Sequence, residues 1–143
     1  MATVKRFDEL KVWELARELC QEIYTQINST DLSNDYALRN QINRSSGSVM
    51  DNIAEGYERG GKKEFIQYLF IAKASCGETR SQIYRAADRN YISPEISDGL
   101  IKKCITLSKK LSSLINYLKQ SEYTGNKFQE EQQIYETNSH LKH

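Results

Sequence analysis

The stretch LRNQINRSSGSVMDNIAEGY, residues 38–57, carries the strongest structural signal in this chain. Its large apolar residues recur at intervals of four and seven positions, which places them on one face of an α-helix. These residues are Leu38, Ile42, Val49, Ile53 and Tyr57. Serine and glycine are poor helix formers, yet positions 45–48 in the middle of the segment read Ser-Ser-Gly-Ser. We therefore expect a helix that packs closely against a neighbouring backbone through these small residues.

A polar stripe runs beside this apolar face. Its members, again at helical spacing, are Gln41, Arg44, Ser48, Asn52 and Glu55. We predict that Arg44, Asn52 and Glu55 are mostly satisfied by hydrogen bonds at helix–helix or subunit contacts. We predict the same of Glu78, which comes from a later helix. Removal of the Glu55 carboxylate should then lower stability or break an oligomer, because a buried partner charge would be left unpaired.

Four amphipathic segments predict four helices, over about residues 8–28, 35–57, 62–89 and 94–120. Four long helices joined by short loops form an antiparallel up-down-up-down four-helix bundle, which is an all-α fold. No sustained apolar–polar alternation occurs, so no strand is expected. We expect residues 1–120 to form one bundle domain. Residues 121–143 are polar and predict a flexible C-terminal tail.

Each of the other helices has its own apolar stripe. The first should bury Leu10, Trp13, Ala16, Cys20, Ile23 and Ile27. The third should bury Phe65, Leu69, Ala72, Cys76, Thr79, Ile83 and Ala86. In the fourth, the apolar residues step by fours and threes, a seam suited to bundle packing: Leu100, Cys104, Leu107, Leu111, Leu114 and Leu118.

Helix ends are also marked in the sequence. Ser93 followed by Pro94 is the clearest start signal, because serine caps a helix and proline suits its first position. The other expected end residues are Asp8 and Glu9 in the first turn of the first helix, Ser33 or Asn34 as the N-cap of the second, and Gly56 or Gly60 as its C-cap.

The quoted stretch resembles the signature of the 23S rRNA intervening-sequence proteins, also called S23-type proteins, which are small four-helix bundles. The matching positions are Leu38, Arg39, Gln41, Ile42, Arg44, Asn52, Ile53, Ala54, Glu55, Gly56 and Tyr57. A second block within residues 64–82 and an opening at residues 7–13 are similar to the same family. The resemblance spans about residues 7–118 and implies the bundle fold independently of the helical spacing.

The resemblance also carries implications for assembly and partners. It implies a ring-shaped homopentamer. It further implies a relation to the accessory proteins of diversity-generating retroelements, which are pentamers that bind nucleic acid and associate with a reverse transcriptase. Those relatives tend to be strongly basic, whereas this chain has a formal net charge of only +1.

The sequence predicts a cytoplasmic protein without a membrane partner. No apolar run approaches the length of a membrane span, and the first residues, MATVKR, lack the apolar core of a signal peptide. The three cysteines, Cys20, Cys76 and Cys104, form no CxxC pair and fall among apolar helical positions. We expect them to be small buried thiols in a reducing compartment.

No constellation for catalysis or cofactor binding is present in the sequence. The only histidines are His140 and His143, both in the predicted tail. A carboxylate-bridged metal site in a helical bundle requires Glu-x-x-His on two helices, and neither Glu55 nor Glu78 has a histidine three residues on. We therefore expect no cofactor, no metal and no enzyme activity.

Basic residues form a ridge in the fourth helix. Lys102 and Lys109 are seven positions apart, as are Lys103 and Lys110, and no acid occurs from residue 99 to residue 120. Such a ridge can neutralise phosphates, although exposed lysines also serve solubility alone. A second basic cluster between the second and third helices comprises Arg59, Lys62 and Lys63.

The aromatic residues suggest an oligomer. Nine tyrosines exceed what a slim bundle core uses, and tyrosine is favoured at interfaces. The candidates are Tyr24, Tyr36, Tyr57, Tyr84 and Tyr91. Two functions remain open: an oligomeric module that binds RNA or DNA, with structured RNA as the leading ligand, and an oligomeric scaffold that binds a protein. Salt sensitivity separates them, because phosphate-driven binding weakens steeply with salt.

Overall fold

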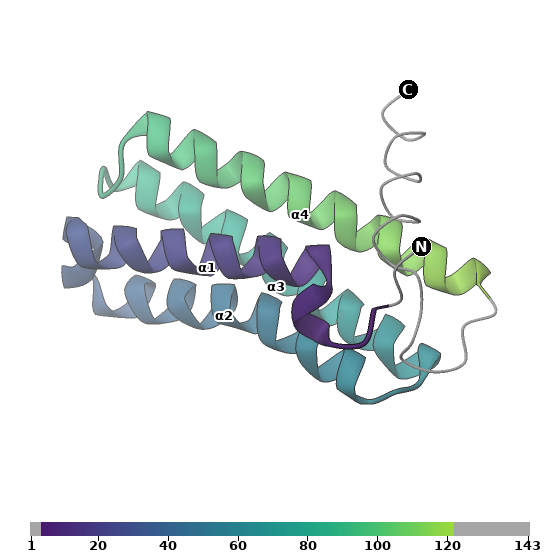
Figure 1. Cartoon of the computed structure of the whole chain (residues 1–143). Coiled ribbons are helices and arrows are strands. Elements are labelled where there is room, and N and C mark those ends of the chain that lie inside the picture. Colours follow the sequence, from purple (N-terminus) through teal and green to yellow (C-terminus); the bar gives the residue numbers. More distant parts are fainter. Residues whose placement is uncertain (1–3, 122–143) are drawn as a thin grey trace, which may run out of the picture.

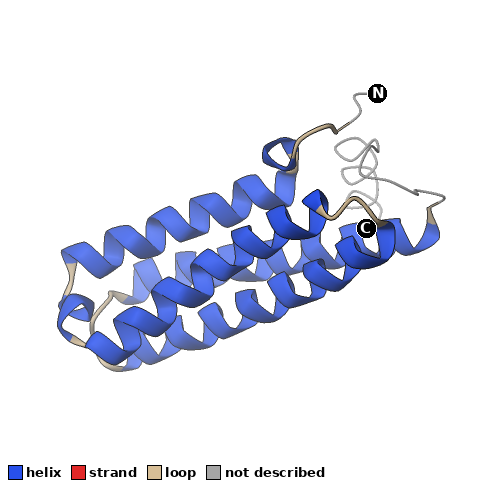
Figure 2. Ribbon diagram, turned by 90° about the horizontal axis from the view of Figure 1, so that it is seen from below, coloured by secondary structure: helices blue, strands red, loops and turns tan. Residues whose placement is uncertain are grey.

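The protein is an all-α bundle of four long helices. The computed structural model describes residues 4–121, so the predicted tail beyond Ser121 lies outside the described part. The helices are α1 (Lys11–Ser29), α2 (Tyr36–Glu58), α3 (Lys62–Asp88) and α4 (Pro94–Gln120). Two short 3-10 helices, Phe7–Glu9 and Asp31–Asn34, precede α1 and α2. Figure 2 shows helices and loops but no strand over the described residues.

The four helices are arranged up-down-up-down, as the sequence predicted. Consecutive helices run antiparallel, and the α1–α2 and α3–α4 links lie at the end of the bundle opposite the α2–α3 link (Figure 1). Each helix packs against two neighbours, and α1 closes the ring against α4. The contact between α2 and α3 is the most extensive, and that between α1 and α4 is the least. The segment that signals the fold therefore lies in the most extensive helix–helix contact.

The start of α1 differs from its prediction. Residues 7–9 form a separate 3-10 turn, Leu10 is extended with φ −71° and ψ 131°, and α1 begins only at Lys11. The cause is the Glu9 carboxylate, which accepts hydrogen bonds from the backbone N–H groups of Lys5 and Arg6 at 3.1 and 2.9 Å. Asp8 and Glu9 thus do not lie in the first turn of α1.

The predicted caps are partly correct. Ser93 caps α4, because its Oγ accepts a hydrogen bond from the Ile96 N–H at 3.2 Å. The N-cap of α2 is Asp35, whose Oδ1 accepts from the Leu38 N–H at 3.2 Å, and not Ser33 or Asn34, which belong to the 3-10 helix before it. At the end of α2 the C-cap is Arg59, so the predicted Gly56 lies inside the helix instead. Gly60 follows the cap at φ +83°, a conformation that suits glycine.

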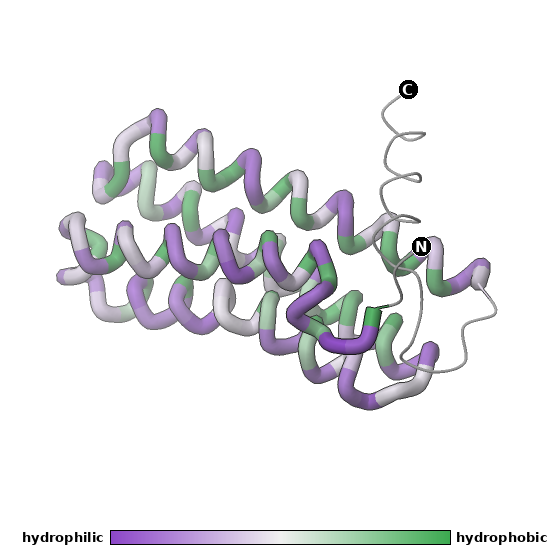
Figure 3. The backbone as a smooth tube through the Cα atoms, viewed as in Figure 1, coloured by the Kyte–Doolittle hydropathy of each residue, from purple (hydrophilic) through white to green (hydrophobic). Residues whose placement is uncertain are grey.

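The core runs along the bundle axis and contains nearly all the expected apolar residues. Hydrophobic positions recur along every helix (Figure 3), and the stripes predicted for α2, α3 and α4 are buried. In α1 the prediction is partly wrong, because Val12 and Leu19 are buried whereas Trp13 and Cys20 are only partly covered. All three cysteines are free thiols, and Cys76 and Cys104 are buried. Among residues 4–121, no helix is long and apolar enough to cross a membrane.

Candidate nucleic-acid interface

The lysines of the α4 ridge differ in whether their side chains are exposed and unpaired. The leucine seam of α4 faces the core, which leaves Lys102 and Lys109 exposed on the outer side. Within residues 4–121 neither of these two makes a hydrogen bond or an ion pair. Lys103 instead forms an ion pair with Glu22 of α1, and Lys110 is half-buried. The open positive charge of the ridge is thus concentrated at Lys102 and Lys109.

The second predicted basic cluster is largely occupied by contacts within the chain. Arg59 Nη2 donates to Glu55 Oε2 and to the Tyr68 hydroxyl, both at 2.8 Å. Lys62 Nζ donates to the Ser121 carbonyl at 2.6 Å and so joins the start of α3 to the end of α4. Only Lys63 is exposed without a bond to the described residues. This cluster lies about three helical turns beyond Lys110, so it does not merge with the ridge.

Glu55 belongs to a surface network. Its side chain is 52% exposed and accepts hydrogen bonds from Arg59 and from the Tyr68 hydroxyl of α3. These bonds hold the pKa of Glu55 below its ordinary value, and they outweigh the opposing effect of desolvation. The full penalty for an unpaired buried charge therefore does not apply to Glu55, and exposed ion pairs contribute little to stability.

The polar stripe of α2 lines a shallow depression of about 400 Å³. Its floor is open at Gly47, where an added Cβ would meet no atom within 4 Å. The expectation that Gly47 packs against a neighbouring backbone is therefore wrong, whereas Ser45 and Ser46 are buried as expected. The lining residues are Asn43, Arg44, Gly47, Ser48, Asp51, Asn52 and Glu55.

The remaining signature residues are satisfied to different extents. Asn52 donates to the carbonyl and the hydroxyl of Ser48, both at 2.8 Å. Gln41 accepts from Arg85 at 3.0 Å. Arg39 donates to the Ser33 carbonyl and stacks over the Tyr36 ring at 4.7 Å. Arg44 and Glu78, in contrast, are exposed and make no hydrogen bond or ion pair to any residue of the described part.

One polar cluster in the core was not predicted. Ser45 Oγ donates to Gln82 Oε1 at 2.6 Å, and Thr79 Oγ1 lies 2.8 Å from Ser45 Oγ. All three side chains are buried between α2 and α3. The signal was present in the sequence, because Ser45 interrupts the apolar face of α2 and Thr79 interrupts that of α3.

The predicted interface tyrosines occupy different environments. Tyr24, Tyr36 and Tyr84 are at least half exposed. Tyr57 is a core residue instead, because its hydroxyl donates to the Val4 carbonyl at 3.0 Å and burial raises its pKa to about 12. Tyr91 is half-buried and donates to Asp35 Oδ2 at 2.9 Å.

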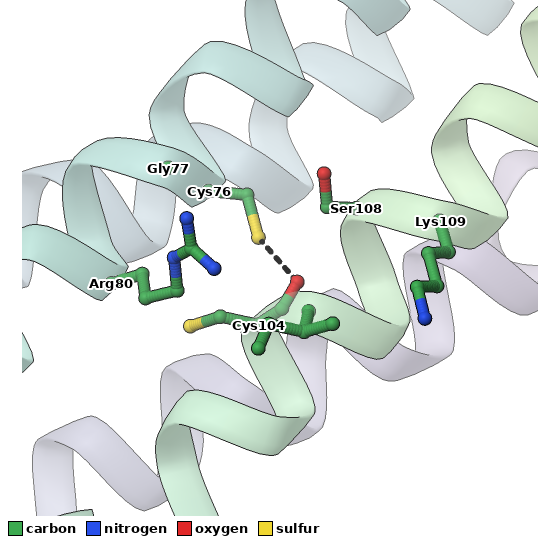
Figure 4. A pocket seen from close by; sticks show the side chains of 7 residues that line it. Cys76, Gly77, Arg80, Cys104, Ser108 and Lys109 are labelled. Carbon is green, nitrogen blue, oxygen red and sulfur yellow. Dashed lines mark hydrogen bonds between the residues drawn. The ribbon is translucent and has the colours of Figure 1, made fainter.

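A cavity of about 220 Å³ opens between α3 and α4. Figure 4 shows Arg80 of α3 directed toward Cys76, with Ser108 and Lys109 on α4 and the Lys109 side chain turned away from Arg80. The Cys76 thiol donates to the Cys104 carbonyl at 3.3 Å. The adjacent Cys76 and then burial raise the pKa of the Cys104 thiol. Across residues 4–121 no three His, Cys, Asp or Glu side chains gather in a way that could hold a metal ion.

Comparisons with known proteins agree with this geometry. A family model described as 23S rRNA-intervening sequence protein matches residues 8–113. A crystal structure of a protein with unknown function from the S23 ribosomal protein family, from Bacteroides thetaiotaomicron, is similar with a TM-score of 0.66. It is 24% identical, and the match covers 73% of this chain and 97% of that one, which shows the fold alone. Among curated proteins, none matches this chain.

Proposed function

This chain belongs to the 23S rRNA-intervening sequence protein family, and from that premise we propose that it is a non-catalytic, homo-oligomeric four-helix-bundle protein that binds structured RNA. The observation that supports the proposal is the pair of open lysines, Lys102 and Lys109, on an outer face of α4 where the nearby Glu22 is already paired with Lys103. Binding comes from the local positive field of this face, because the whole chain has a net charge of only +1.

Repetition of the lysine face in an oligomer strengthens this weak patch. Each copy supplies a few phosphate contacts, and linked copies bind the same RNA with a high effective concentration. We propose five copies as the leading stoichiometry, in agreement with the resemblance to ring-shaped bundle proteins. DNA offers the same phosphates, so the face distinguishes the two nucleic acids only through the shape of the ligand.

The α2–α3 face is the proposed subunit contact. It carries the depression of α2, which the unpaired Arg44 lines, and α3 adds the exposed Glu78. Ile71 of α3 is 43% exposed on the same side, one turn before Ser75, which contacts Ser48 at the edge of the depression at 2.9 Å. A second copy placed here would cover an exposed isoleucine and pair charges that have no partner within the described chain.

The test is RNA binding measured over a salt series. Wild-type protein, the double variant Lys102→Gln/Lys109→Gln and a matched control, Lys5→Gln/Arg17→Gln, are titrated into a labelled RNA stem-loop. Each double variant loses two exposed charges, but only the first loses them from α4. The α4 variant should bind more weakly, and its salt slope should fall by roughly 0.7–0.9 for each phosphate that the protein no longer neutralises.

Two outcomes contradict the proposal in different ways. If wild-type protein does not bind RNA or DNA at low salt, the nucleic-acid function is wrong. If both double variants weaken binding equally, α4 is the wrong face.

An alternative function is an oligomeric scaffold or adaptor that binds a protein partner. The resemblance to retroelement accessory proteins implies that this partner is a reverse transcriptase. On this alternative the depression of α2 and the exposed Ile71 beside it receive the protein partner instead of a second copy of the chain. A complex held by burial of Ile71 would persist at salt concentrations that release a phosphate-bound ligand.

A further inference from the structure

We propose that the cavity between α3 and α4 is a seat for one phosphodiester of the RNA backbone, held by Arg80 and Lys109. The inference rests on the proposed function and goes beyond the lysine ridge, because it adds a residue of α3 and a concave surface. The residues that line the cavity are Cys76, Gly77, Arg80, Cys104, Ile105, Ser108 and Lys109.

The rim of the cavity is cationic and comes from two helices. Arg80 lies on α3 with its guanidinium directed toward Cys76, and Ser108 and Lys109 lie on α4 at the other side of the cavity (Figure 4). The Lys109 side chain points away from Arg80 in this view, so its flexible stem must rotate for the ammonium to meet the same phosphate. A guanidinium can donate two parallel hydrogen bonds to the non-bridging oxygens of a phosphate, and an ammonium adds a point charge. Ser108 adds a hydroxyl donor. Gly77 keeps the α3 side open, because an added Cβ there would meet no atom within 4 Å.

The two rim cations have no counter-charge among the described residues, a property that they share with Lys102. Lys103, Arg59 and Arg89 are paired with Glu22, Glu55 and Asp35, respectively. Arg80 and Lys109 make no hydrogen bond or ion pair to any described residue. No acid lines the cavity. Contact with Cys104 lowers the pKa of the Cys76 thiol against the opposing effect of burial, and the charges of Arg80 and Lys73 add to the lowering.

The floor indicates a nucleotide rather than a bare anion. Cys76 and Cys104 are buried and, with Ile105, give the cavity an apolar base beneath the cationic rim. A nucleotide matches both parts, because its phosphate suits the rim and its sugar or an unstacked base suits the floor. Looped and bulged positions of structured RNA present such nucleotides.

The first test compares two arginines of α3 that lie on different sides of that helix. Arg80→Gln removes the proposed contact, whereas Arg85→Gln removes the same charge from the side that faces α2, where Arg85 donates to Gln41. In anisotropy titrations with a labelled RNA stem-loop, Arg80→Gln should bind about tenfold more weakly at low salt. Its salt slope should fall by about one unit. Arg85→Gln should bind like wild type, and Lys109→Gln should behave like Arg80→Gln.

The second test uses small probes and reads the site directly. Uridine 5′-monophosphate should shift the amide NMR signals of Gly77 and Ser108, and uridine without its phosphate should not. Arg80→Gln should abolish these shifts while the remaining spectrum stays that of a folded bundle.

The outcomes separate the two proposals. If wild-type protein binds RNA and Arg80→Gln binds as well as Arg85→Gln, the proposed phosphodiester site is wrong and the proposed function stands. If wild-type protein binds no RNA at low salt, the proposed function fails and the seat fails with it. If an acidic peptide competes as effectively as unlabelled RNA, the phosphodiester site is also wrong, because a carboxylate would then bind there equally well.

Discussion

Gly56 of α2 lies so close to Tyr68 of α3 that a Cβ added to the glycine would stand 2.5 Å from the tyrosine Cβ. The Phe65 ring lies 3.3 Å from the same position. No side chain fits between these atoms, so the absence of one at Gly56 sets the separation of α2 and α3 near the loop that joins them. The glycine of the family-like signature is therefore explained by packing.

Gly56→Ala should destabilise the protein. Alanine is the better helix former, but overpacking at a tight contact typically costs about 1–3 kcal/mol. Gly47→Ala is the matched control in the same helix, because its Cβ would meet no atom within 4 Å. That control should gain about 0.5–1 kcal/mol from helix propensity. Urea unfolding of the two variants measures both free energies, and a change of the same sign in both would contradict the packing argument.

Ser45→Ala should cost about 1–3 kcal/mol, because it leaves the buried Gln82 Oε1 without its donor. Ser45→Ala/Gln82→Leu should recover part of that loss, since replacing both partners by apolar groups can be nearly neutral. Thermal unfolding of the single and double variants provides the comparison. If the double variant loses as much unfolding free energy as the two single variants together, or more, the cluster does not act as one unit.

Asp35→Asn should change how stability depends on pH. The Asp35 carboxylate accepts hydrogen bonds from the Leu38 N–H, Tyr91 and Arg89, and these hold its pKa below the ordinary value of 3.8. A depressed carboxylate pKa stabilises the folded state above the unfolded pKa, and this stability is lost as the pH falls through the folded pKa.

The wild type should therefore lose the Asp35 contribution below about pH 4. Asparagine is also a good N-cap, so the variant isolates the charge. The difference in melting temperature between the two proteins should be present at pH 7 and shrink on acidification. A constant difference would show that the charge of Asp35 is unimportant.

Ile71→Glu should dissociate the proposed oligomer and leave the bundle folded, because Ile71 is already 43% exposed. Ile96→Glu is the matched control, with a side chain 39% exposed at the start of α4. Sedimentation equilibrium should give a multiple of 16.6 kDa for wild type and for the control, and about one chain mass for Ile71→Glu. A wild-type mass of 16.6 kDa at micromolar concentration would contradict an oligomer.

The parts of the fold that local spacing determines were predictable. The seams of α3 and α4 and the Ser93 cap depend on residues a few positions apart, which the sequence displays directly. The start of α1 was not predictable. It depends on the Glu9 carboxylate, which accepts hydrogen bonds from the backbone of Lys5 and Arg6, so that Glu9 does not join the first turn of α1. The N-cap of α2 was not predictable either, since Asp35 and its two preceding neighbours all have side chains that can cap a helix.

For the candidate site, the sequence predicted which basic residues are present but not which of them are left unpaired. The sequence shows the lysines of α4, but the pairing of Lys103 with Glu22 joins residues 81 positions apart and no spacing rule reveals it. The same holds for Arg80, because the register between α3 and α4 decides that it lines the same cavity as Lys109. Which charges remain open is a property of the packed helices rather than of any one of them.

Val4 and Ser121 are held at the same end of the bundle, where Tyr57 binds the carbonyl of the first and Lys62 binds that of the second. Tyr57 and Lys62 flank the single turn between α2 and α3 (Figure 1). A bundle with this arrangement is suited to domain insertion. Spliced at Val4 and Ser121 into a surface loop of a host protein, the bundle would join the host at one end only. The α1–α2 and α3–α4 links would then point away from the host.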